Sequence, residues 1–157
     1  PLAQQQASLM ASEVRRMVLS DLPGVLQNER LGYAHPWAEG IFKDCLRNNH
    51  ECWLLMSSDQ NVGHGIMSVA VGESHLLNVC VHPDYQGLGF GRILVEHLIE
   101  RARLGEASTM FLEVRPLNVV ARELYSKLGF NEVGLRENYY PSHVGREDAL
   151  VLAKELF

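Results

Sequence analysis

A chain of 157 residues has the length of one domain, and its apolar content of 46% is typical of a protein with a buried core. Its 14 basic and 19 acidic residues give a net charge of −5, which argues against nucleic acid as a direct partner and suits a basic peptide or an amine. No apolar run is long enough to cross a membrane, and Cys45, Cys52 and Cys80 lack metal-ligand spacing, so we expect reduced thiols, no metal site and a cytoplasmic location.

The first half of the chain predicts a mixture of strands and helices. Residues 1–12 are expected to be a loose lead-in, and the domain to occupy residues 13–157. Asp21 can cap a helix that has Pro23 in its first turn, and Asp59-Gln60-Asn61 predicts a hairpin turn. The elements expected here are a strand over 13–19, helices over 21–33 and 38–48, and strands over 52–56, 62–71 and 75–81.

The second half predicts elements that alternate between helix and strand. A helix over 92–104, a strand over 110–114 and a helix from Asn118 to Leu128 are followed by Gly129, which suits a helix end. Final strands are expected over 130–135 and 149–152, with a polar loop that carries Tyr139 and Tyr140 between them. This order predicts a single-domain α/β fold with a mixed, largely antiparallel sheet that is parallel near the glycine-rich segment.

That segment, Gln86 to Arg92, reads Gln-Gly-Leu-Gly-Phe-Gly-Arg and joins a strand to a helix. A glycine-rich turn at a helix N-terminus exposes backbone N–H groups that can hold a phosphate. The chain lacks the Gly-Lys-Ser/Thr of nucleoside triphosphatases, and its glycines are not spaced as in dinucleotide folds. An ordinary turn without a ligand is the alternative interpretation.

The pattern Gln-x-x-Gly-x-Gly resembles that of the GNAT acetyltransferases, which hold the pyrophosphate of acetyl-CoA with it. The segment 124–130, Leu-Tyr-Ser-Lys-Leu-Gly-Phe, is also widely shared in that family. Leu112-Glu113-Val114-Arg115 and the segment 136–141 more specifically resemble the bacterial enzymes that acetylate the N-terminal alanine of ribosomal protein S18. The resemblance implies the GNAT fold, with helices on both faces of the sheet, and acetyl-CoA as co-substrate.

The resemblance also implies which residues contact the cofactor. The backbone of Gly87, Leu88, Gly89, Phe90, Gly91 and Arg92 would hold the pyrophosphate. Asn118 would add a contact, although it could equally be only a helix cap. Backbone N–H groups of Val79, Cys80 and Val81 would meet the thioester carbonyl. Cys80 also invites a mechanism through an acetyl-cysteine, but a cysteine in a buried strand is usually a packing residue.

Two residues are candidates for proton transfer. Strand alternation places Phe111 and Glu113 on one face, and a carboxylate in an apolar strand needs a function or a partner such as Arg115. The resemblance favours Glu113 as the base. It implies Tyr125 as the acid that protonates the leaving thiolate, whereas the helical position alone would suggest a core aromatic. No role is assigned to His75, His82 or His97.

The function expected is therefore acetyl transfer from acetyl-CoA to a protein α-amine, with the N-terminal alanine of ribosomal protein S18 as acceptor. Alternatives are acetylation of other peptide N-termini, lysines or a small amine, or a CoA-binding module without turnover. Trp37, Tyr139 and Tyr140 could shape a peptide groove or could only pack within loops.

Overall fold

The computed structural model describes residues 11–157, so most of the expected lead-in lies outside the described residues. Seven strands form one hydrogen-bonded sheet in the order β1-β2-β3-β4-β5-β7-β6. Its parallel pair is β4–β5, and the pairs β1–β2, β2–β3, β5–β7 and β6–β7 are antiparallel, as the sequence predicts for a mixed sheet. The elements are β1 Ser12–Arg16, α2 Leu22–Gly32, α3 Glu39–Arg47, β2 Glu51–Ser57, β3 Gln60–Ala70, β4 Glu73–Val81, α4 Phe90–Leu104, β5 Thr109–Val114, α5 Val119–Lys127, β6 Asn131–Ser142 and β7 Gly145–Glu155.

The chain forms two compact units. The first contains the described residues up to Met67 together with Asn78–Leu98, and the second contains Ser68–Leu77 and Ile99–Phe157. No helix in the described part of the chain combines the length and the apolar character that a membrane crossing requires.

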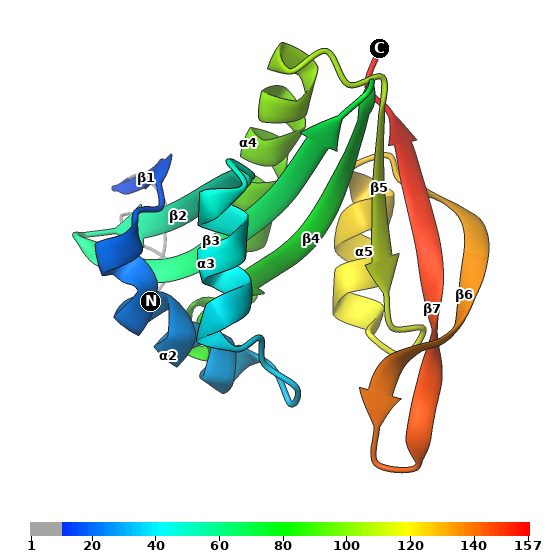
Figure 1. Ribbon diagram of the computed structural model, residues 1–157, viewed down its shortest axis with the longest axis horizontal. Helices are drawn as coiled ribbons and strands as arrows, with labels where there is room; N and C mark the ends of the chain where they lie inside the picture. Colours follow the sequence, from blue (N-terminus) through cyan, green and yellow to red (C-terminus); the bar gives the residue numbers. More distant parts are fainter. Residues whose placement is uncertain (1–10) are drawn as a thin grey trace. The chain divides into compact units, whose positions relative to one another are not determined.

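In the first unit, helices cover both faces of the strands. Figure 1 shows α2 and α3 in front of β2 and β3, with α4 behind them. Gly65 lets α4 approach β3 closely, since a Cβ atom there would lie 2.8 Å from Leu98. The buried residues of α3 are Phe42 and Cys45, whereas the apolar Ile41 is 44% exposed, because the helix turns Phe42 toward the sheet.

In the second unit, β5 shows a strict alternation of burial. Met110, Leu112 and Val114 are at most 4% exposed, while Phe111 and Glu113 face the other side of the sheet. This confirms the faces predicted from strand period. Asn118 caps α5, since its Oδ1 accepts a hydrogen bond from the backbone N–H of Ala121 at 3.2 Å, and Gly129 follows the helix with φ of +93°.

The prediction of a polar loop between the last two strands is wrong. β6 and β7 continue through it as a long hairpin, seen in orange and red in Figure 1, and its register ends at Ser142↔Gly145. The ladder shifts between Arg136 and Tyr140, and Asn138 in that shift has φ of +54°. Such a bulge bends the strand and redirects side chains, so Tyr139 and Tyr140 lie on a strand and not in a loop.

Two tight turns also differ by about one residue from those predicted. The turn between β2 and β3 is Ser58-Asp59, and the turn between β3 and β4 is Val71-Gly72. All four residues have φ between +50° and +79°, as a type I′ hairpin turn requires. Val71 is fully exposed there, although a β-branched residue is poorly suited to positive φ.

Candidate active site

The glycine-rich segment has the conformation expected of an anion-binding loop. Gly87 and Gly89 have φ of +75° and +93°, which side chains rarely adopt, and α4 begins immediately afterwards at Phe90. A Cβ atom at Gly87 would meet nothing within 4 Å, so the space in front of the loop is open. The free N–H groups of the first helical turn and this open approach suit the pyrophosphate of a nucleotide cofactor.

Glu113 is held by two partners that come from other strands of the sheet. Its Oε2 lies 2.5 Å from Nε2 of His75 on β4, and its Oε1 lies 2.9 Å from a guanidinium nitrogen of Arg136 on β6. The Glu113 side chain is only 7% exposed. Arg115, which the sequence offered as one possible partner, pairs with Glu147 at 2.9 Å instead.

These contacts set the ionisation of Glu113. Burial raises the pKa of its carboxyl, but the hydrogen bonds and charges of His75 and Arg136 exceed that effect and leave the pKa below its usual range. The carboxylate is therefore ionised at neutral pH and acts as a hydrogen-bond acceptor through both oxygens.

His75 is the residue of this group to which the sequence assigned no role. In the parallel register His75 is paired with Phe111, so both share a face with Glu113. His75 and Glu113 line an open pocket of about 440 Å³, together with Ser68, Ala70, Glu73, Ser74, Phe111 and Val151. Strand alternation in β4 could have indicated the face on which His75 lies. It could not have identified Glu113 as its partner, because the register between β4 and β5 is not known from the sequence.

Tyr125 lies on α5 and is 8% exposed. Its ring packs edge-on against Phe130 at a centroid distance of 5.5 Å, which agrees with the core-aromatic interpretation. Burial raises the pKa of its hydroxyl well above the usual range, so the group stays protonated at neutral pH. Among the described residues, none forms a hydrogen bond with this hydroxyl, which leaves its proton available to a bound molecule.

The segment Val79-Cys80-Val81 ends β4, beyond the residues that pair with β5, since that register covers Glu73–Leu76. The Val79 carbonyl accepts a hydrogen bond from the Tyr33 hydroxyl, and the Val81 carbonyl accepts one from the Gln86 side chain at 3.1 Å. The contacts of Val79–Val81 and Asn118 with a cofactor stay predictions.

Cys80 is poorly suited to act as a nucleophile. Its side chain is 3% exposed and donates to the backbone oxygen of Asn28 at 3.4 Å. Burial, and then the charge of Glu29, raise the pKa of the thiol to about 12, so that very little thiolate exists at neutral pH.

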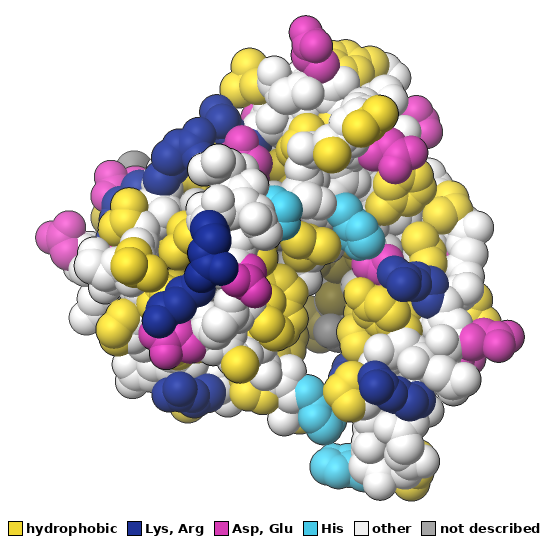
Figure 2. Space-filling model, in the orientation of Figure 1, with side chains coloured by type: hydrophobic (Ala, Val, Ile, Leu, Met, Phe, Trp, Pro, Cys, Tyr) yellow, Lys and Arg dark blue, Asp and Glu magenta, His cyan; other side chains and the backbone are white. Residues whose placement is uncertain are grey.

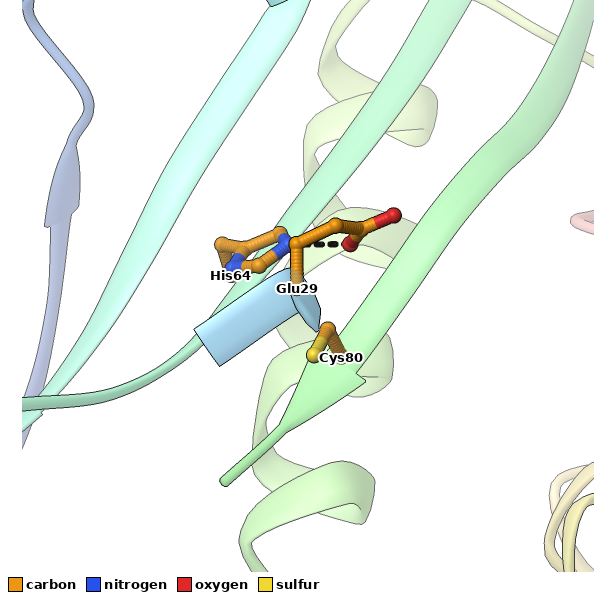
Figure 3. Close-up of side chains that lie close together, drawn as sticks. All are labelled: Glu29, His64 and Cys80. Atoms are coloured by element: carbon orange, nitrogen blue, oxygen red, sulfur yellow. Dashed lines mark hydrogen bonds and ion pairs between the residues drawn. The ribbon is translucent and has the colours of Figure 1, made fainter. Parts of the chain in front are cut away.

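A second group of polar side chains is buried in the first unit. Figure 3 shows Glu29 on α2, His64 on β3 and Cys80 on β4 close together. Oε1 of Glu29 lies 3.0 Å from Nε2 of His64, and the amide of Asn78 donates to both carboxylate oxygens at 3.1 and 3.2 Å. The backbone N–H of Trp37 donates to Oε2 at 2.9 Å. Glu29 therefore ties α2, β3, β4 and the segment before α3 into one hydrogen-bonded network.

The aromatic residues considered for an acceptor groove are held by neighbours. Trp37 lies outside the helices and strands, as predicted, and packs against Phe42. Arg136 lies 4.5 Å above the Tyr139 ring, and Arg115 lies 4.3 Å above the Tyr140 ring. Basic and acidic side chains are interspersed over the face seen in Figure 2.

Known proteins resemble this chain over most of its length. The sequence model of the Acetyltransferase (GNAT) family matches residues 13–130. The ribosomal protein bS18-alanine N-acetyltransferase of Escherichia coli K12 is 40% identical over 134 residues, which cover 85% of this chain and 90% of that protein. The enzyme of the same name from Haemophilus influenzae is 36% identical over 143 residues, which cover 90% of this chain and 97% of that protein.

Solved structures agree with these matches. The crystal structure of the ribosomal-protein-S18-alanine N-acetyltransferase from Escherichia coli superposes with a TM-score of 0.86 at 36% identity, covering 92% of this chain and 94% of that one. Arabidopsis thaliana Naa50, in complex with a bisubstrate analogue, has a TM-score of 0.82 at 19% identity over 92% of this chain and 99% of that one, a likeness of fold. The chain belongs to the GNAT acetyltransferase family and is an acyltransferase that takes its acetyl group from acetyl-CoA.

Proposed function

We propose that this acetyltransferase modifies a protein α-amine, and that its acceptor is the N-terminal alanine of ribosomal protein S18. The observation that carries the acceptor is the 40% identity to the Escherichia coli enzyme of that name across 90% of its length. A cytoplasmic location belongs to the same proposal, because ribosomes lie there and the three cysteines are unpaired thiols.

Glu113 and Tyr125 carry out the proton transfers in this proposal. The substrate amine arrives as an ammonium group with a pKa of about 8 and must lose a proton before it can attack. Glu113, ionised and held in place by two donors, supplies the basic function. Tyr125, protonated and without a partner among the described residues, supplies the acid.

The glycine-rich loop is the proposed cofactor site. The backbone of Gly87–Arg92 binds the pyrophosphate, Asn118 adds a contact, and N–H groups of Val79–Val81 meet the thioester carbonyl. Acetyl-CoA supplies the acetyl group as a thioester, and the buried, protonated Cys80 thiol favours direct transfer to the amine.

Free-thiol release on mixing the protein with acetyl-CoA and a peptide of the S18 N-terminus tests this function. We expect thiol release with the free α-amine and none with the same peptide already acetylated at its N-terminus. Release from an N-acetylated peptide that contains lysine would favour the lysine alternative. Cofactor binding without thiol release from either peptide would favour a CoA-binding module.

A further inference from the structure

The position of His75, beside a buried carboxylate and at the edge of an open pocket, suits a catalytic imidazole. Its ring is 34% exposed, it lines the open pocket beside Glu113, and its Nε2 lies 2.5 Å from the Glu113 carboxylate. Nδ1, the other ring nitrogen, makes no hydrogen bond to any residue in the described range 11–157. One nitrogen is therefore fixed by a carboxylate, and within residues 11–157 the other has no hydrogen-bond partner, on a side chain that lines the pocket.

The partner determines which tautomer the ring adopts. Glu113 is ionised beside Arg136, and an ionised carboxylate can only accept hydrogen bonds. The nitrogen that faces it must then carry the hydrogen, so a neutral His75 has N–H at Nε2 and its lone pair at Nδ1. This is the arrangement in which the aspartate of a Ser-His-Asp triad orients its histidine as a base.

We propose that Glu113 and His75 form a catalytic dyad, in which Nδ1 of His75 receives the proton of the acceptor α-ammonium. The N–H bond of the ammonium breaks, its electron pair stays on the amine nitrogen, and the proton forms a bond with Nδ1. Nε2–H stays with Glu113, whose charge stabilises the imidazolium. The inference rests on the proposed function and deepens it, because Glu113 provides the base through a second residue.

Chemistry favours the ring over the carboxylate as the accepting group. A general base works best when its proton affinity suits the operating pH, and imidazole is the side chain that changes charge nearest neutrality. Arg136 and His75 lower the pKa of Glu113, which makes the carboxylate itself a weak base. The charged or titratable groups around the dyad are Glu73 on β4 and Arg136, Tyr139 and Tyr140 on β6, besides His75 and Glu113 themselves.

Two variants separate the dyad from a lone carboxylate base. His75→Gln keeps an N–H donor for Glu113 but has no basic nitrogen, so kcat/KM at pH 7 should fall by roughly 10²-fold or more. Activity should recover partly at high pH, where the α-amine loses its proton to solvent. Glu113→Gln keeps the acceptor for Nε2–H and loses the charge, so its fall should be smaller and the acidic limb of its pH profile should move to lower pH.

If Glu113 alone were the base, Glu113→Gln should lose more kcat/KM than His75→Gln. Near-normal kcat/KM in His75→Gln, with Glu113→Gln almost inactive, would overturn the dyad and leave the proposed function intact. Melting curves of both variants establish that they are folded.

Nitrogen-15 spectra of the histidine rings in the free wild-type protein give a readout that needs neither substrate nor turnover. We expect neutral His75 to be the Nε2–H tautomer, and to lose that preference in part in Glu113→Gln. A predominant Nδ1–H tautomer would overturn the dyad, whereas absence of thiol release with the S18 peptide would overturn the acceptor proposal.

Discussion

The guanidinium of Arg136 reaches Oε1 of Glu113 at 2.9 Å, from a strand that lies beyond β7 in the sheet. Arg136 is the last residue paired with β7 before the bulge, since the β6–β7 register shifts immediately after it. A long hairpin that local sequence does not predict therefore controls the charge at the centre of the proposed site.

Arg136→Gln should raise the pKa of Glu113 toward its usual range. Burial raises this pKa, and in the variant only His75 is left to lower it. In the wild type the lowered pKa contributes stability that is present above the unfolded value of about 4 and is lost as pH falls through the folded value. The variant should lose less stability on acidification. Carboxyl NMR titration and denaturant unfolding at pH 7 and pH 3 measure the two effects, and an unchanged Glu113 titration would contradict the prediction.

Gly89→Val should weaken acetyl-CoA binding at least tenfold, because a β-branched residue is strained at φ of +93° and its side chain would displace the loop. Calorimetry measures the Kd. Gly72→Val is the matched control, since Gly72 has a similar φ of +79° in a turn outside the cofactor loop. Both variants should lose stability, and only Gly89→Val should lose cofactor affinity. Equal affinity in the two would exclude the loop as the binding site.

Tyr125→Phe should lower turnover by roughly 10²–10⁴-fold, as expected when a general acid is lost. Its melting temperature should stay close to that of the wild type, because the hydroxyl has no partner among the described residues and the ring remains packed on Phe130. Turnover is measured with chemistry rate-limiting, alongside calorimetric binding of acetyl-CoA. Normal turnover would return Tyr125 to a purely structural role.

Glu29→Leu should destabilise the fold by about 3–5 kcal/mol, because it removes one member of a buried pair and leaves His64 and Asn78 without their acceptor. Chemical denaturation measures the free energy of unfolding. Glu39→Leu is the control on the neighbouring helix, where the pair with Lys43 is about half exposed on both sides. It should change stability by less than about 1 kcal/mol. Similar losses in both variants would show that Glu29 is not a structural anchor.

The parts of the fold that the sequence predicts well are those with strong periodicity. The alternation in β5 identified the face of Glu113, and Asn118 and Gly129 marked the ends of α5 correctly. Residues 136–148 predict a loop because they are polar, although the structure continues the two strands through most of this segment.

The partners of Glu113 cannot be predicted from the residues near it in the sequence. Arg115 is near in sequence, yet it pairs with Glu147, while His75 is 38 residues away from Glu113 and Arg136 is 23. Their meeting depends on three interstrand registers, β4–β5, β5–β7 and β6–β7, the last of which is shifted by a bulge. The chemistry of single residues can be predicted from sequence, whereas the grouping of His75, Glu113 and Arg136 depends on how the strands pair.

The turn at Val71 is a site where a single substitution should raise the thermal stability of the protein. A fully exposed valine at φ of +53° gains no packing from its side chain and costs about 1 kcal/mol of backbone strain. Val71→Asn should relieve that strain and raise the melting temperature by roughly 2–4 °C in calorimetric scans. Since the turn lies outside the residues proposed for catalysis and cofactor binding, heat tolerance could be gained here without a loss of catalytic speed.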